Sequence, residues 1–181
     1  MIRNLPIETP RLVLRDLAEG DGPAVHAYAS DAAVVRHLDW GPNTAEDTAR
    51  FLEMAQAARE AVPRTAYHLA IVLRATDRLI GGCRIEIRNA ASGNGDIGYV
   101  LARDVWGQGY ASEAARALLT FGFKTLALHR IWATCDVENS ASARVLEKIG
   151  MEHEGRLRES VRRRGEWRDS HLYAILESEL G

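Results

Sequence analysis

The stretch YVLARDVWGQGYASEAAR, residues 99–116, passes from an apolar run through a turn with two glycines into an alanine-rich segment. The first part is typical of a β-strand and the last part of a helix, so Gly107 and Gly109 lie at the junction. Glycine adopts backbone torsions that other residues avoid, and it leaves no side chain in the way of a ligand. The first N–H groups of a helix lack partners inside the helix and favour an anion. The junction therefore predicts a phosphate-binding turn, although an ordinary tight turn also accounts for the two glycines.

Composition limits the class of protein. The chain has 181 residues, of which 46% are hydrophobic and 27% charged, and its formal net charge is −2. These values predict one globular domain over residues 1–181, without a general attraction to DNA or to an anionic membrane. The sequence has neither the apolar core of a signal peptide nor an apolar run of membrane-spanning length, so we expect a cytoplasmic protein. Cys83 and Cys135 lie in apolar runs and are expected to be reduced, buried thiols.

Strand-like and helix-like patterns follow one another in the order β, α, α, β, β, β, α, β, α, β, β. The expected helices are 19–31, 43–61, 110–126 and 139–150, and the expected strands include 11–17, 66–73, 78–87, 95–102, 130–137 and 171–178. A further strand is expected before the basic turn at 162–169. An antiparallel group followed by a strand–helix–strand unit predicts an α/β fold with a mixed sheet between helices.

Two longer motifs carry a resemblance to a known family. DIGYVLARDVWGQGYASEA at 96–114 and ATCDVENSASARVLEKIGM at 133–151 resemble the GNAT superfamily of acyl-CoA-dependent N-acyltransferases. Within it, the chain is most similar to the RimJ/RimL-type branch, which includes ribosomal-protein N-terminal acetyltransferases. The resemblance implies one domain with a partly splayed sheet of about seven strands and about four helices. It also implies acetyl-CoA as co-substrate and an amine acceptor, either a ribosomal or other protein N-terminus or a small molecule such as an antibiotic or polyamine. A homodimer is left open.

The resemblance places the cofactor on the turn described above. The family pattern of Gln or Arg, two residues, Gly, one residue, and Gly or Ala falls on Trp106, Gly109 and Ala111, so Trp106 departs from it. Because this loop binds pyrophosphate mainly through backbone N–H groups, we expect binding to survive the departure. The implied cofactor-binding residues are Tyr99, Val100 and Leu101 beside the pantetheine arm, Gly107, Gln108, Gly109, Tyr110, Ala111 and Ser112 around the pyrophosphate, and Asn139 at the far part of the arm.

The resemblance also suggests an acid and a base. Asp96 stands where the branch commonly carries a glutamate that resembles the general base, and being shorter it is expected to act through a water; Glu86 is the next candidate. The alternative for Asp96 is a solvated residue at the start of a strand. Many members use a tyrosine as the acid, but Leu146 takes its place here, whereas Ser142 resembles the proton donor of the Rim-type branch. Ser142 is equally of a type that caps helices, and the thiolate could leave unassisted.

Other readings compete with these assignments. Cys135 could act as a nucleophile, but no base stands near it in sequence, so a core position is favoured. The six histidines show no metal-ligand spacing, which predicts no metal. The basic run at 162–167 is expected to be solvated at a hairpin tip, with contact to an acidic substrate or RNA as the alternative. Trp40 and Tyr28 could line the amine pocket or belong to the core. A non-catalytic acyl-CoA sensor and an RNA-associated module remain the rival functions.

Overall fold

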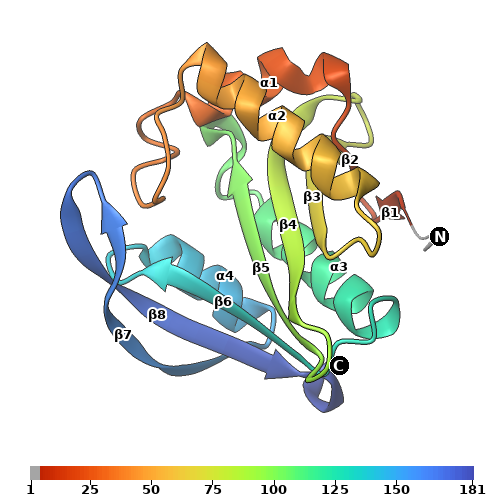
Figure 1. Cartoon of the computed structure of the whole chain (residues 1–181), viewed down its shortest axis with the longest axis vertical. Helices are drawn as coiled ribbons and strands as arrows, with labels where there is room; N and C mark the ends of the chain where they lie inside the picture. Colours follow the sequence, from red (N-terminus) through yellow and green to blue (C-terminus); the bar gives the residue numbers. More distant parts are fainter. Residues whose placement is uncertain (1–4) are drawn as a thin grey trace.

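The computed structural model describes residues 5–181 and arranges eight strands in one open, mixed sheet with the order β1-β2-β3-β4-β5-β6-β8-β7 (Figure 1). The strands are β1 (Ile7–Glu8), β2 (Leu12–Asp16), β3 (Ala66–Leu73), β4 (Leu79–Asn89), β5 (Asn94–Leu101), β6 (Arg130–Asp136), β7 (Glu152–Arg163) and β8 (Glu166–Leu176). The helices are α1 (Gly22–Ala29), α2 (Ala45–Glu60), α3 (Tyr110–Lys124) and α4 (Ser140–Lys148), with 3₁₀ turns at Glu19–Asp21, Arg103–Val105 and Glu177–Glu179.

The predicted α/β class and the mixed sheet between helices are confirmed. The sheet has one strand more than expected, because Ile7–Glu8 pairs antiparallel with β2 as a short edge strand. The first helix is shorter than predicted. The Asp21 side chain does not cap it but accepts hydrogen bonds from the Arg15 guanidinium at 2.7 and 2.9 Å, and a 3₁₀ turn precedes the helix.

The sheet is divided where β5 meets β6. These parallel strands pair only over Asn94–Asp96 and Arg130–Trp132, after which β5 stays with β4 and β6 with β8. The two strands therefore diverge beyond Asp96 and Trp132 and leave a gap that widens toward their carboxyl ends (Figure 1).

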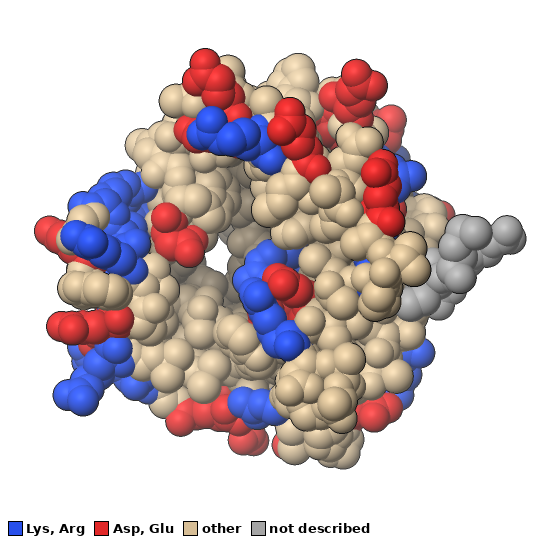
Figure 2. Space-filling view, viewed as in Figure 1, with Lys and Arg blue, Asp and Glu red and all other residues tan. Residues whose placement is uncertain are grey.

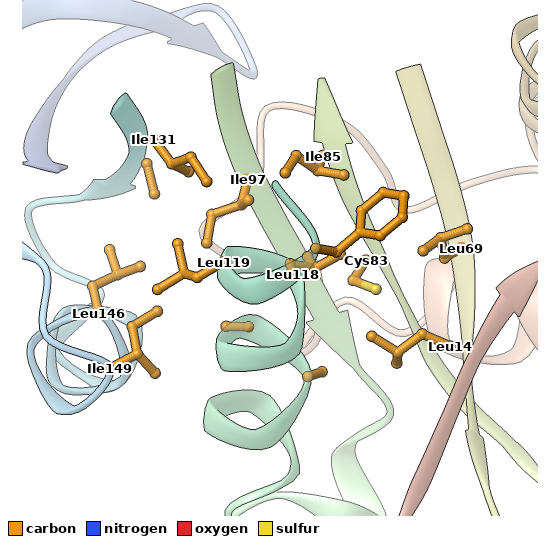
Figure 3. Packing of buried hydrophobic residues seen from close by; sticks show 14 of the residues in the cluster. Leu14, Leu69, Cys83, Ile85, Ile97, Leu118, Leu119, Ile131, Leu146 and Ile149 are labelled. Carbon is orange, nitrogen blue, oxygen red and sulfur yellow. The ribbon is translucent and has the colours of Figure 1, made fainter. Parts of the chain in front are cut away.

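The main core lies between the sheet and helices α3 and α4. On α3, Leu119 lies beside Ile97 of β5 and Leu118 lies nearer Cys83 of β4, while Leu146 of α4 closes the core beneath β6 (Figure 3). Gly122 lets α3 approach the sheet closely, since a Cβ there would lie 2.5 Å from Ile131 Cδ1. Burial of this apolar surface fixes the start of α3 against the end of β5.

Helices α1 and α2 cover the other face of β3 and β4 (Figure 1). Helix α2 begins with a capping box: Thr44 Oγ1 accepts from the Asp47 N–H at 3.1 Å, and the Thr44 N–H donates to the Asp47 carboxylate at 2.9 Å. The loop before it, residues 30–44, reaches the tip of the β7–β8 hairpin. There the Arg164 guanidinium donates to the carbonyls of Val35, Arg36 and Gly41 at 3.2, 3.3 and 3.4 Å. We call this contact the Arg164 bridge.

Candidate active site

The gap between β5 and β6 is part of a cavity of about 1530 Å³. Loop 30–44, β4, β5, the 107–112 turn, β6, α4 and the β7–β8 hairpin all contribute to its lining. Figure 2 shows an opening near the centre of the molecule, with basic and acidic side chains beside it. The volume exceeds that of a pocket for one drug-sized ligand, which is at most about 1,000 Å³. The cavity can therefore hold an extended cofactor together with an acceptor.

The glycine turn has the geometry of an anion site. Gly107 and Gly109 have φ angles of 76° and 82°, in the left-handed region where side chains are disfavoured. The first bond of α3 runs from the Glu113 N–H to the Gly109 carbonyl at 3.1 Å. Within residues 5–181, the backbone N–H groups of residues 107–112 have no hydrogen-bond partner. These donors and the helix dipole favour a phosphate at this end of the cavity.

Arg11, which lies just before β2 and carries no functional expectation from the sequence, fixes this turn. Its guanidinium donates to the Gln108 carbonyl at 2.9 Å, pairs with Glu113 at 2.6 Å and lies 4.4 Å from the centre of the Tyr110 ring. Glu113 also accepts from Thr9 Oγ1 at 2.7 Å. A cation thus stands beside the free N–H groups. No sequence signal links Arg11 to residues about a hundred positions later.

The edge of β5 presents backbone groups to the gap. The Ala102 N–H bonds to the Ile80 carbonyl, so the alternation of an antiparallel pair turns the backbone groups of Tyr99 and Leu101 away from β4 and toward β6. The Leu101 carbonyl is taken by Trp106 Nε1 at 2.9 Å, which leaves the groups of Tyr99. Val100 is opposite Gly82 and faces β4 with its backbone. Tyr99 thus has the geometry expected of a contact to the pantetheine arm.

Helix α4 starts on the opposite side of the gap. Asn139 caps it by accepting from the Ser142 N–H at 3.1 Å, which leaves the Asn139 amide nitrogen as a donor. Ser142 is therefore not the cap, and its Oγ lies 2.9 Å from Tyr99 Oη. Burial raises the pKa of the Tyr99 phenol, which stays protonated at neutral pH. The structure thus brings two predicted site residues, Tyr99 and Ser142, together across the gap.

Asp96 lies on the opposite face of β5 from Tyr99 and is 1% exposed. One carboxylate oxygen pairs with Arg84 Nη2 at 2.6 Å and the other with Arg88 Nε. The second candidate base, Glu86, accepts from Arg88 Nη1 at 2.9 Å. Asp96 is thus not a solvated residue at a strand start, and arginines hold the oxygens of both candidates. Strand alternation puts Arg84, Glu86 and Arg88 on one face of β4 and could have shown the pairing of Glu86, whereas the pairing of Asp96 depends on the register of β5 against β4.

A second buried carboxylate, Asp136, stands at the end of β6. Arg163 Nη1 lies 2.9 Å and Arg168 Nε 3.3 Å from its Oδ2. Burial pushes the pKa of Asp136 up, but the Arg168 hydrogen bond and the Arg163 charge outweigh this, and the pKa is lowered. The prediction that residues 162–167 are solvated is therefore wrong for Arg163, which lines the cavity. Arg164 is exposed as predicted, although its guanidinium also forms the bridge.

Three further points concern the predicted residues. His37, Asp136 and Glu138 place ligand atoms within 4.8 Å of one another, but Arg163 and Arg168 already pair with Asp136, so we assign no metal there. The predicted lack of a metal stays a prediction.

Cys83 and Cys135 are buried free thiols, as expected. Tyr28 is buried at 4% exposure whereas Trp40 is exposed at 39%, and both line the cavity.

Comparisons with known proteins identify the family of this chain. Residues 11–152 match the family model described as an acetyltransferase (GNAT) domain. The chain is 38% identical over 173 residues to the uncharacterized N-acetyltransferase YnaD of Bacillus subtilis, covering 96% of this chain and 98% of that protein. A GNAT-family acetyltransferase from Bacillus anthracis superposes with a TM-score of 0.84 at 37% identity, covering 96% and 99% of the two chains. Mycobacterium smegmatis RimJ in complex with CoA-disulfide gives a TM-score of 0.82 at 27% identity, covering 93% and 83%. Among the helices of residues 5–181, none is both long and apolar enough to cross a membrane.

Proposed function

Because this chain belongs to the acetyltransferase (GNAT) family and is an acetyl-CoA-dependent acyltransferase, we propose that it moves the acetyl group directly to a primary amine, with a protein N-terminus or a simple amine as the acceptor. The observation that carries this is the gap between β5 and β6, which joins the free N–H groups of the 107–112 turn to the part of the same cavity that loop 30–44 lines. In this proposal residues 1–181 form one cytoplasmic domain. Two more specific proposals are that the activity is RimJ-like, with a ribosomal protein as acceptor, and that the protein forms a homodimer.

The proposed cofactor site uses the residues that line this gap. The pyrophosphate accepts hydrogen bonds from the N–H groups of residues 107–112, and the pantetheine arm lies between Tyr99 and Asn139. Ser142 donates a proton to the departing thiolate, and its contact with Tyr99 Oη at 2.9 Å keeps its hydroxyl on the gap. Because the cofactor then occupies the side of the 107–112 turn, the acceptor enters from the side of loop 30–44.

Charge within the cavity supports an acceptor with one cationic group. Asp96 is neutralised by Arg84 and Arg88, and Asp136 by Arg163 and Arg168. A polyamine needs several uncompensated carboxylates, whereas a single ammonium group needs only one partner. We therefore propose a peptide N-terminus or a simple amine ahead of a polyamine.

Release of CoA from acetyl-CoA, followed with a thiol reagent, tests the proposal on a panel of N-terminal peptides, simple amines and polyamines. The expected result is turnover that is highest with peptides or simple amines. Tight binding of acetyl-CoA without turnover on any amine would instead support the rival sensor function. Salt-sensitive RNA binding that is lost in Arg162→Ala, the one arginine of the run at 162–164 not tied to Asp136 or loop 30–44, would support the RNA-associated module.

Direct transfer predicts that acetyl-CoA alone leaves no covalent mark on the protein. Burial raises the pKa of Cys135 to about 11, so this thiol is protonated and a poor nucleophile at neutral pH. Intact-protein mass spectrometry after incubation with acetyl-CoA is expected to show the unmodified mass. A stoichiometric adduct that disappears on addition of the amine would establish an acyl-enzyme and contradict direct transfer.

Asp96→Asn separates two roles of Asp96. Removal of a general base lowers turnover by about 10²-fold or more, and the loss shrinks at high pH as the amine arrives deprotonated. Loss of an ion-paired carboxylate instead leaves Arg84 and Arg88 facing one another, which costs about 1–2 kcal/mol with half-exposed partners. We expect the second result: a lower melting temperature, turnover within about tenfold of the wild type and an unchanged acid limb of the pH profile. The first result would make Asp96 the base.

A further inference from the structure

One titratable group of the cavity has no role in the account above. His37 lies in loop 30–44, its side chain is 20% exposed, and it lines the cavity across from β6. Its Nδ1 is buried and makes no hydrogen bond within the described part of the chain. The nearest carboxylate oxygen is Asp136 Oδ1, 3.8 Å away. An imidazole nitrogen that is buried and faces a carboxylate is the arrangement in which an Asp orients a catalytic His.

The surroundings of Asp136 keep it charged and in place. Arg163 from β7 and Arg168 from β8 contact it, and the Glu138 N–H donates to its Oδ1 at 2.9 Å. The Arg164 bridge holds the carbonyls of Val35 and Arg36, so the residues just before His37 are tied to the same hairpin. The position of His37 relative to Asp136 is thus fixed from both sides.

We propose that His37 is the general base of the transfer reaction and that Asp136 is its positioning residue. This inference rests on the proposed function. With Nδ1 turned to Asp136, Nε2 accepts a proton from the acceptor ammonium. The freed amine attacks the thioester carbonyl carbon, a C–N bond forms, and the C–S bond breaks to release CoA thiolate. The thiolate takes a proton from Ser142 or water, and the second proton of the amine, which the nitrogen loses as it becomes an amide, restores the proton of that donor. The imidazolium then returns its proton to solvent.

The charges around His37 suit this task. Burial lowers the pKa of His37 below its usual value; the charges of Asp136 and Glu138 act to raise it, and those of Arg36 and Arg163 to lower it further. The ring is therefore neutral at pH 7 and able to accept a proton. Asp136 then stabilises the imidazolium that forms. The 3.8 Å separation is long for a hydrogen bond, as is usual in catalytic sites without substrate.

The rival bases are less available. Both oxygens of Asp96 face guanidinium groups, and Glu86 is held by Arg88 and Arg84. Protonation of either carboxylate would break an ion pair. Protonation of His37 breaks no ion pair and instead places a positive charge on a ring whose Nδ1 lies 3.8 Å from Asp136 Oδ1.

The test is His37→Gln, with His68→Gln as the matched control. His68 lies on β3, lines the same cavity, and burial also lowers its pKa, but its charged neighbours are Arg84 and Arg64 rather than a carboxylate. For each protein, kcat/KM is measured from pH 5.5 to 9.5 with the best amine of the panel, together with the Kd for CoA and the melting temperature.

The kcat/KM of the wild type is expected to fall below the pKa of His37, which gives the pH profile an acid limb. His37→Gln is expected to lose about 10²-fold in kcat/KM at pH 7 and to lose this acid limb. The Kd for CoA should stay within about twofold. The loss should shrink for an acceptor that is already unprotonated at the assay pH, which a merely structural role would not produce. His68→Gln should keep the limb, and Asp136→Asn should shift it.

Turnover of His37→Gln within about threefold of the wild type, or an unchanged acid limb, would overturn the inference while leaving the proposed function intact. A wild type without turnover on any amine would overturn both. If His37→Gln melts well below the wild type, the comparison between acceptors that are protonated and unprotonated at the assay pH still tests whether His37 is the base. Both values of kcat/KM are measured with the same variant.

Discussion

Gly109→Glu is expected to weaken CoA binding by at least about tenfold while the protein stays folded. The variant places a carboxylate where the N–H groups of residues 107–112 favour a phosphate, so charge repulsion replaces attraction. The new Cβ would lie 3.5 Å from Arg11 Nη2, an ordinary contact, and the new acid could pair with this cation and remove it from the phosphate. Isothermal titration calorimetry with CoA measures the effect.

Gly109→Gln is the matched control, because it has nearly the same size and the same strain at φ 82° but no charge. We expect its affinity to lie between those of the wild type and Gly109→Glu. Equal affinities for Gly109→Glu and the wild type would remove the cofactor from this turn. Equal losses in both variants would show that backbone strain rather than charge is responsible.

Gly81→Ala is expected to destabilise the protein by about 3 kcal/mol, at the upper end of the usual cost of overpacking. A Cβ at this position would lie 2.2 Å from the Val100 carbonyl oxygen, and backbone cannot move aside as a flexible side chain does. Relief requires β4 and β5 to separate at Val100 and Leu101, which lie beside the gap. We therefore expect a lower urea midpoint and weaker CoA binding together.

Gly20→Ala is the control for Gly81→Ala, because a Cβ at position 20 would meet no atom within 4 Å. Its midpoint should stay within the error of the wild type. A stable Gly81→Ala protein with full CoA affinity would mean that the β4–β5 pairing adjusts without cost to the cofactor site.

Local patterns predicted the elements that depend on neighbouring residues. The glycine junction before α3 and the Asn139–Ser142 segment each lie within a few residues, and each has the expected place in the fold. Tyr99 and Ser142 were both named from sequence, but their contact across 43 residues was not. That contact depends on the divergence of β5 from β6, which follows from how long each strand pairs with its other neighbour.

Charge compensation was the part that sequence reasoning could not reach. Asp96 looks like a free carboxylate in the sequence, and only the register of β4 against β5 brings Arg84 and Arg88 to it. The basic run at 162–167 looks like a solvated hairpin tip for the same reason. Whether Arg163 faces water or Asp136 is decided by the return of β8 beside β6, some thirty residues away.

The Arg164 bridge determines the shape of acceptor that can reach the reaction centre. The two arms of the sheet are joined where β5 pairs with β6, and the bridge joins them again through loop 30–44, so protein surrounds the opening seen in Figure 2. Under the proposed function, the acceptor then enters this opening end-on from the side of loop 30–44 rather than lying across the surface. The free end of an unfolded peptide or a small amine can enter in this way, whereas a lysine in the middle of a folded surface cannot.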